Sequence, residues 1–343
     1  EQLGLVDDIF NQLFRLGNIQ YLVDEPGIED IFIKGPYTYV KEPTTGRMQP
    51  RPPAFDDDDE VIEWLQFQAG RAPGGGRAFS RANPELRLNL PGGIRLSAMA
   101  YTSEHPSIAL RQHRLHNITL DTLVGYGVMP PILARLLSAA VNGAMSIVIA
   151  GPMGSGKTTM VRALANDLPT DTRIGTAETE FELMLDKIPG REPYVVANET
   201  ITGGGERNQL TNALVGQTSL TDILYGYVRQ MLDRIIVGEV AGPEIIAMYQ
   251  AMQFCEGTLS TTHATSARGA IDRLVTIALA NGGLDRTYAE RQAAHHIDLI
   301  IQLKSDRIIK SAGVSSLNRY ISEIAWVEQG ENDRAALTMI YRG

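Results

Sequence analysis

The chain has 343 residues, of which 43% are hydrophobic and 21% charged, and its formal net charge is −9. Because single hydrophobic cores rarely serve so long a chain, two domains are expected. The ordinary composition excludes a chain that is disordered throughout. The acidic balance disfavours nucleic acid as the main partner, although a local basic channel is compatible with it. No apolar run reaches the length of a membrane span.

Cys255 is the single cysteine, so no disulfide can form within the chain. A reducing compartment suits such a chain, and the start of the sequence lacks the basic and apolar features of a signal peptide. We therefore expect a cytoplasmic protein whose association with membranes is peripheral. The sequence begins at Glu1 without a methionine, which favours a trimmed chain that has lost an upstream segment.

Residues 1–115 are expected to form an α+β domain. Helical spacing of apolar residues predicts an amphipathic helix over 6–22, and the acids at 56–59 predict the start of a second helix, because carboxylates suit the N-terminal end of the helix dipole. Short alternating segments predict antiparallel strands. These segments are 28–33, 38–40, 86–90, 94–100 and 107–111. Scattered glycines before Pro130 and Pro131 favour a linker over 116–130.

Residues 131–343 are expected to form a larger α/β domain. Short β-rich runs alternate with helical or loop segments, which is typical of a mostly parallel sheet with helices on its faces. The predicted strands cover 146–150, 173–177, 234–238 and 258–262, and the predicted helices cover 132–141, 157–167, 243–253 and 267–280. A stretch rich in glycine and polar residues, 189–218, is predicted to be a mobile loop.

The segment 151–158 reads GPMGSGKT, fits the phosphate-loop pattern G-x-x-x-x-G-K-[ST] and follows the predicted strand 146–150. Its glycines let the backbone curl so that N–H groups surround phosphates. The lysine reaches the terminal phosphates, the threonine hydroxyl is a Mg²⁺ ligand, and the following helix points its positive end at the anion. We expect ATP with Mg²⁺ as the cofactors, bound by Gly151, Pro152, Met153, Gly154, Ser155, Gly156, Lys157, Thr158 and Thr159.

Three further polar residues follow predicted strands of the same sheet. These are Glu178, Glu239 and His263. Ligands of open parallel sheets gather at strand ends, and hydrolysis of ATP needs a group that positions water and groups that stabilise charge on the departing phosphate. Glu180 or Glu182 could take the place of Glu178, and His263 could be a structural histidine.

The ordered segments resemble those of the type II/IV secretion ATPase superfamily. The run 258–268, TLSTTHATSAR, looks like its histidine box, 233–242 like its Walker B segment, and 176–178 like its aspartate box. The similarity is greatest to the CpaF-type ATPases that power Tad pili and to related type IV secretion motors. It extends from the N-terminal helix almost to the C-terminus.

The resemblance implies a RecA-like motor domain behind a smaller N-terminal domain, assembled as a ring, usually a hexamer, on the inner-membrane platform of a secretion or pilus machine. By matching position, Glu178 is the catalytic base, Glu239 organises Mg²⁺ and water, and His263 senses the γ-phosphate. Arg95 and Arg111 match arginines that reach the nucleotide from the N-terminal domain, although both could be solvated strand residues.

The sequence also departs from the family pattern. Thr179 stands where an aspartate usually follows the box glutamate. Family arginines are absent from four positions, 221, 225, 231 and 241, although Arg229 is retained. These differences put an arginine finger from the motor domain in doubt. Two alternatives to a secretion motor therefore stay open: a nucleotide-gated scaffold with little turnover, and a nucleic-acid translocase, which the acidic charge disfavours.

Overall fold

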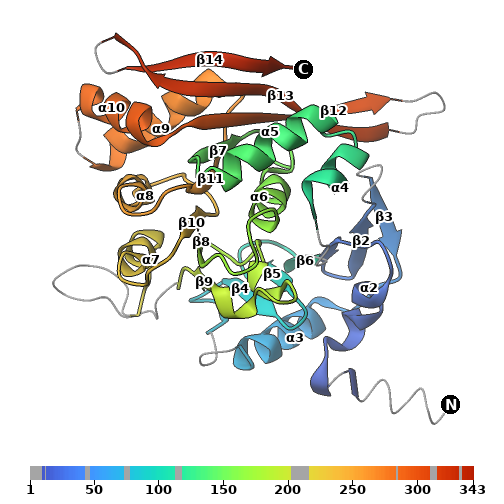
Figure 1. Cartoon of the computed structure of the whole chain (residues 1–343). Coiled ribbons are helices and arrows are strands. Elements are labelled where there is room, and N and C mark those ends of the chain that lie inside the picture. Colours follow the sequence, from blue (N-terminus) through green and yellow to red (C-terminus); the bar gives the residue numbers. More distant parts are fainter. Residues whose placement is uncertain are drawn as a thin grey trace. The chain divides into compact units, whose positions relative to one another are not determined.

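The computed structural model describes residues 10–11, 13–42, 47–72, 78–112, 118–201, 216–282, 285–309, 315–331 and 334–343 (Figure 1). The chain divides into two compact units, one with residues 1–114 and 307–317, the other with 115–306 and 318–343. Each unit is described by itself. Among the described residues, no helix combines the length and the apolar character that crossing a bilayer requires.

The first unit is built on a six-stranded antiparallel sheet of order β3-β2-β1-β6-β5-β4. Its strands are β1 (Asp30–Lys34), β2 (Tyr37–Lys41), β3 (Met48–Arg51), β4 (Glu85–Leu90), β5 (Ile94–Met99) and β6 (Ser107–Gln112). The five predicted strands are confirmed, and β3 is an additional edge strand. Alternate residues of these strands, including Ile31, Leu96 and Leu110, are buried in one core, so the other face of the sheet carries the more exposed side chains.

Two helices complete this core. α3 (Asp58–Gly70) starts as predicted, because the Asp57 carboxylate caps it by accepting a hydrogen bond from the Glu60 N–H at 2.9 Å. The continuous helix predicted over 6–22 is wrong in its described part. Gly17 has a φ of +58°, which an α-helix cannot contain, and the chain forms a 3₁₀ turn (Gly17–Ile19) and the short α2 (Gln20–Asp24). Residues 1–9 lie outside the described part.

The second unit contains an eight-stranded sheet of order β14-β13-β12-β7-β11-β10-β8-β9. The six strands from β12 to β9 run parallel, and β13 pairs with β14 antiparallel, so the predicted mostly parallel sheet is confirmed. The strands are β7 (Ile147–Ala150), β8 (Ile174–Glu178), β9 (Val195–Glu199), β10 (Arg234–Val237), β11 (Leu259–Thr262), β12 (Leu299–Ile309), β13 (Ser315–Gln329) and β14 (Ala335–Arg342).

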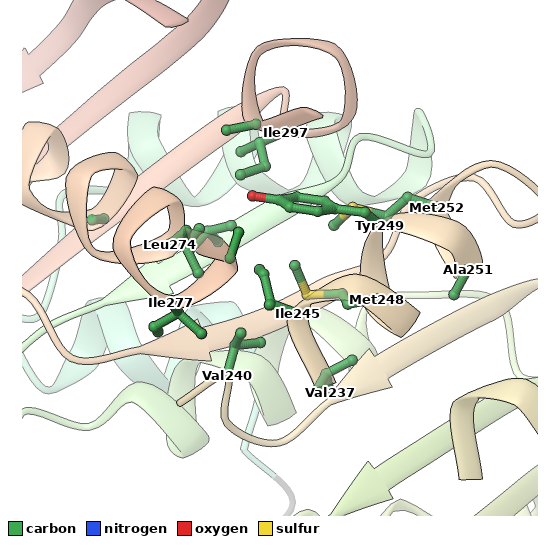
Figure 2. Close-up of a cluster of buried hydrophobic side chains, with 14 of the residues drawn as sticks. Val237, Val240, Ile245, Met248, Tyr249, Ala251, Met252, Leu274, Ile277 and Ile297 are labelled. Carbon is green, nitrogen blue, oxygen red and sulfur yellow. The ribbon is translucent and has the colours of Figure 1, made fainter. Parts of the chain in front are cut away.

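Helices cover both faces of this sheet (Figure 1). They are α4 (Leu120–Gly125), α5 (Pro131–Asn142), α6 (Lys157–Asn166), α7 (Leu220–Tyr227), α8 (Glu244–Met252), α9 (Ala267–Gly282) and α10 (Arg286–His296). Successive residues of β7 show the two faces: Ile147 and Ile149 are buried with α4 to α6, whereas Val148 and Ala150 are buried with α7 to α10. Figure 2 shows part of the second core, where Ile245 and Met248 of α8 gather with Val237 and with Leu274 of α9.

The segment expected to be a linker, 116–130, contains the helix α4 at Leu120–Gly125. Thr119 and Thr122 form a reciprocal capping box, in which the Thr119 hydroxyl accepts a hydrogen bond from the Thr122 N–H at 3.1 Å. Leu120 and Leu123 are then buried in the core beneath α5 and α6. These residues belong to the second unit because burying them against it outweighs the turn-forming tendency of the glycines that follow.

The predicted mobile loop 189–218 is also structured at its N-terminal end. Residues 192–194 form a 3₁₀ turn, and β9 adds a parallel strand beside β8. The Tyr227 hydroxyl bonds the two strands, since it lies 2.6 Å from the Thr176 carbonyl oxygen and 3.0 Å from that of Val196. Residues 202–215 lie outside the described part.

Arg191 ties this segment to the end of α6. The side chain is buried, and its guanidinium donates to the carbonyl oxygens of Asn166, Leu168 and Pro169. Burial lowers the pKa of Arg191. The positive group therefore satisfies carbonyl oxygens at the negative end of α6, of which that of Pro169 also accepts from the Thr172 N–H at 3.1 Å.

We expect Arg191→Met to lower the free energy of unfolding by about 2 to 4 kcal/mol, because buried carbonyls lose a charged donor. Urea denaturation followed by circular dichroism measures this change. Arg173→Met is the matched control, because Arg173 is exposed and makes one side-chain contact to the Gln230 carbonyl; a change of less than about 1 kcal/mol is expected there. Equal losses in both variants would contradict the assigned role.

Cys255 lies in the core under α8. The residue is 7% exposed, and its thiol donates to the Asp233 carbonyl oxygen at 3.2 Å. Burial, the largest influence, raises the pKa of the thiol to about 11. The sulfur is therefore protonated and shielded at neutral pH.

Candidate functional site

The phosphate loop connects the fully buried strand β7 to α6. Gly154 and Gly156 have φ angles of +74° and +93°, in the region that favours glycine. A Cβ on Gly151 would lie 2.5 Å from Ser155 Oγ and 3.0 Å from the Leu303 carbonyl oxygen, so a larger residue there would displace the loop. The Ser155 hydroxyl is buried and has no hydrogen-bond partner among the residues that the structure describes. The loop thus has the predicted shape, and its Ser155 hydroxyl is available to bind a ligand.

Lys157 extends back over this loop. Its Nζ donates to the carbonyl oxygens of Gly151 at 3.1 Å and Pro152 at 3.2 Å, and lies 3.3 Å from Nδ1 of His263. Burial lowers the pKa of Lys157, and the nearby carboxylates of Glu239 and Glu182 oppose that shift. The ammonium group is only partly compensated by neutral carbonyls, which suits it to binding an anion.

Glu239 and His263 come together at the ends of adjacent parallel strands. Glu239 follows β10 and His263 follows β11. The Glu239 Oε1 lies 3.2 Å from Nε2 of His263, and both side chains are more than 40% exposed. The imidazole therefore links the Glu239 carboxylate to Lys157, and the three predicted residues form one polar chain beside the loop.

Glu178 has a different environment from the one its expected catalytic role requires. The residue is 2% exposed. Its Oε1 accepts from the Thr176 hydroxyl at 2.8 Å, and its Oε2 accepts from the N–H groups of Glu182 and Leu183, both at 2.8 Å. Burial is the largest influence on the carboxyl group and raises its pKa. The Glu178 carboxyl group is therefore enclosed and holds the turn after β8 through these hydrogen bonds.

Glu182, four residues further on, reaches the phosphate loop instead. Its Oε2 accepts a hydrogen bond from the Thr158 hydroxyl at 3.0 Å. The Glu178 carboxylate bonds the Glu182 N–H, so the buried acid positions the partly exposed one. The alternative acid considered in the sequence is therefore the one beside the expected Mg²⁺ ligand.

The donor set fits a nucleotide with its magnesium ion. The described residues contain no group of three or more His, Cys, Asp or Glu that could hold a metal alone. Mg²⁺ bound with nucleotide needs only one or two protein oxygens, because phosphates and water supply the rest. Thr158 and a nearby carboxylate meet that requirement, and the unpaired Ser155 hydroxyl and the N-terminal end of α6 suit phosphate.

Arg95 and Arg111 lie opposite each other on β5 and β6 of the first unit. The Arg111 Nε donates to Oδ1 of Asp30 at 2.7 Å, an ion pair on the more exposed face of that sheet. The structure thus brings the two predicted arginines together. Their expected contact with nucleotide remains a proposal.

Sequence reasoning missed two residues of the second unit near the loop. Gln302 on β12 is fully buried, pairs in register with Ala150, and donates to the Ala264 carbonyl oxygen behind His263 at 3.1 Å. Arg319 on β13 donates from Nε to the Gly154 carbonyl oxygen at 2.8 Å. Neither stands in a local motif, because each reaches the site through the order of strands in the sheet.

Residues 63–319 match the family described as "Type II/IV secretion system protein". An uncharacterised protein of Methanocaldococcus jannaschii is 30% identical over 268 residues, which cover 76% of this chain and 45% of that protein. The chain thus spans less than half the length of this relative. The type IV secretion system protein PtlH of Bordetella pertussis is 30% identical over 220 residues, covering 57% of this chain and 62% of PtlH.

The fold is also that of a solved ATPase. The X-ray structure of DotB from Legionella pneumophila aligns with a TM-score of 0.61 over 93% of this chain and 81% of DotB, at 18% identity. At this identity the likeness concerns the fold alone. It agrees with the expected RecA-like α/β domain and smaller α+β N-terminal domain, which the two sheets confirm.

Proposed function

Because the chain belongs to the type II/IV secretion system protein family, we propose that it is a Mg²⁺-dependent ATPase. One observation supports this most strongly: Lys157 at the phosphate loop lies 3.3 Å from His263, which lies 3.2 Å from Glu239. This row of a cation, an imidazole and a carboxylate beside a phosphate-binding loop supplies the side chains that phosphoryl transfer needs.

Each residue would have a distinct task. Lys157 and the loop N–H groups would bind the phosphates, and the Thr158 hydroxyl would hold Mg²⁺, which neutralises phosphate charge when bound. Glu239 would orient water near the metal. One ring nitrogen of His263 can donate a hydrogen bond while the other accepts one. His263 would therefore hold Lys157 and Glu239 in fixed positions relative to each other.

We assign the general base to Glu182 in place of Glu178. A base must lie within hydrogen-bond reach of the attacking water, and Glu182 contacts Thr158 at 3.0 Å. Glu178 is enclosed, and its oxygens already accept three hydrogen bonds. Its task would be to fix the backbone from which Glu182 projects.

The family and the names of its members support a role in a membrane-associated secretion machine. We propose that the chain assembles into a ring, with a hexamer as the expected form. The ring would lie at the cytoplasmic face of an inner membrane, bound to a platform protein. Arg95 and Arg111 would reach nucleotide from the first unit, and a CpaF-type pilus motor is the specific form favoured by the sequence. Opening and closing of the units would convert nucleotide contacts into movement.

Steady-state phosphate release tests this proposal. We expect turnover with MgATP that disappears when EDTA removes magnesium, and no stimulation by single-stranded DNA. Tight MgATP binding with turnover no faster than a Lys157→Ala preparation would favour the nucleotide-gated scaffold. Stimulation by DNA would favour the translocase.

A further inference from the structure

Arg319 contacts the phosphate loop from a strand 165 positions further along the chain. Its Nε donates to the Gly154 carbonyl oxygen at 2.8 Å. A Cβ on Gly156 would lie 3.7 Å from Cδ of Arg319, so the aliphatic part of the side chain lies against the loop as well. The arginine therefore meets the loop at two of its glycines.

This contact fixes the direction of a loop N–H. A trans peptide unit is planar, so its C=O and N–H point in opposite directions. Because Arg319 holds the Gly154 carbonyl, the N–H of Ser155 points away from the arginine, and it donates to the Pro152 carbonyl oxygen at 3.3 Å. The contact therefore helps to fix the shape of a loop whose other N–H groups are expected to surround phosphate.

The guanidinium group of Arg319 can donate further hydrogen bonds. Arg319 is exposed, and within the described ranges its two terminal nitrogens donate to no other residue. The carboxylates of Glu239 and Glu182 lie close enough to Lys157 to oppose the lowering of its pKa by burial. A second cation at the loop would therefore strengthen a site whose charge is otherwise balanced by acids.

We propose that Arg319 is a nucleotide-binding residue: its Nε positions the Gly154–Ser155 peptide, and its terminal nitrogens bind the polyphosphate of a nucleoside di- or triphosphate. This inference rests on the proposed function of the loop. It also supplies a further arginine within the motor unit, where four arginines of the family pattern are absent. The residue binds ground-state nucleotide, so its effect falls on KM more than on kcat.

The test measures the dissociation constants of ATP and ADP by calorimetry in the full chain. Arg319→Gln removes the charge, and we expect the dissociation constants to rise about tenfold or more, as for a lost charged hydrogen bond. Arg319→Lys keeps a point charge without the fork, and its values are expected between those of the wild type and Arg319→Gln. KM should rise with the dissociation constant, while kcat stays within about threefold.

Arg342→Gln is the matched control, because Arg342 is an exposed arginine on β14 of the same sheet. Dissociation constants for Arg319→Gln within about twofold of the wild type would overturn the proposal, as would equal weakening by Arg342→Gln. The melting temperature without nucleotide should be the same in the wild type and in both Arg319 variants. If the melting temperature instead falls in both variants in proportion to their loss of affinity, the proposal is also overturned, because the role of Arg319 would then be structural. If Lys157→Ala loses binding while Arg319→Gln does not, only this inference fails; if neither loses binding, the proposed function fails too.

Discussion

Lys157→Ala is expected to weaken MgATP binding about a hundredfold or more, because the ammonium group would contact two phosphates and each charged hydrogen bond contributes about 1.5 to 3 kcal/mol. Without nucleotide, Lys157 forms hydrogen bonds to two loop carbonyls and lies beside the His263 ring. The variant should therefore remain folded. Calorimetric titration with MgATP measures the loss, and circular dichroism verifies the fold.

Lys187→Ala serves as the matched control. Lys187 pairs with Asp186 at the surface, and its side chain is 57% exposed, so its removal should leave the dissociation constant of MgATP unchanged. Wild-type affinity in Lys157→Ala would mean that the loop at 151–158 is not the nucleotide site. The assignments of Thr158, Glu182 and Arg319 would then lose their basis as well.

Glu182→Gln should reduce ATP turnover about a hundredfold or more while MgATP still binds, since the lost carboxylate would be the general base. Glu178→Gln, the same chemical change four residues earlier, should keep turnover within about tenfold. A glutamine fits there, because its carbonyl oxygen can accept from the Glu182 and Leu183 N–H groups while its amide donates to the Thr176 hydroxyl. Steady-state phosphate release at saturating MgATP compares the two variants.

The opposite result would restore the role first expected from the sequence. If Glu178→Gln is inactive and Glu182→Gln turns over at the wild-type rate, Glu178 is the base and must become accessible when nucleotide binds. Both variants should bind MgATP in the same titration. This requirement separates a lost chemical step from a lost site.

The phosphate loop could be predicted because its geometry depends on local residues. Gly154 and Gly156 take left-handed conformations that other residues rarely adopt, and the buried β7 is a short apolar run. Strand ends of a parallel sheet share one edge, which made Glu239 and His263 foreseeable. These contacts follow from motifs and strand order together.

Other features depend on the balance between local turn-forming residues and burial against the rest of the fold, which no single segment reveals. Gly125 and Gly127 give the stretch before Pro130 the composition of a linker, yet the capping box at Thr119 and burial of Leu120 produce a helix. At the N-terminus the apolar spacing continues through Gly17, and only its φ of +58° interrupts the helix. The spacing of apolar residues indicates which side chains can be buried together. It does not indicate where the backbone must turn.

The acids after β8 show the same limit at the site. Positions 178, 180 and 182 are all glutamates, and the one that faces the loop depends on the turn that the Glu178 carboxylate itself closes. Arg319 could not be found from the sequence because it reaches Gly154 through β13, two strands away from β7 in the sheet. Contacts of this kind require the three-dimensional arrangement.

The enclosure of Cys255 makes the protein convenient for fluorescence work. Maleimide dyes react with thiolates, and a thiol with a pKa of about 11 in a residue that is 7% exposed offers almost none at neutral pH. A cysteine introduced on the surface, for example Asn318→Cys beside Arg319, should therefore be labelled alone with the native cysteine left in place. Dye-labelled protein could then report nucleotide arrival at the loop in real time.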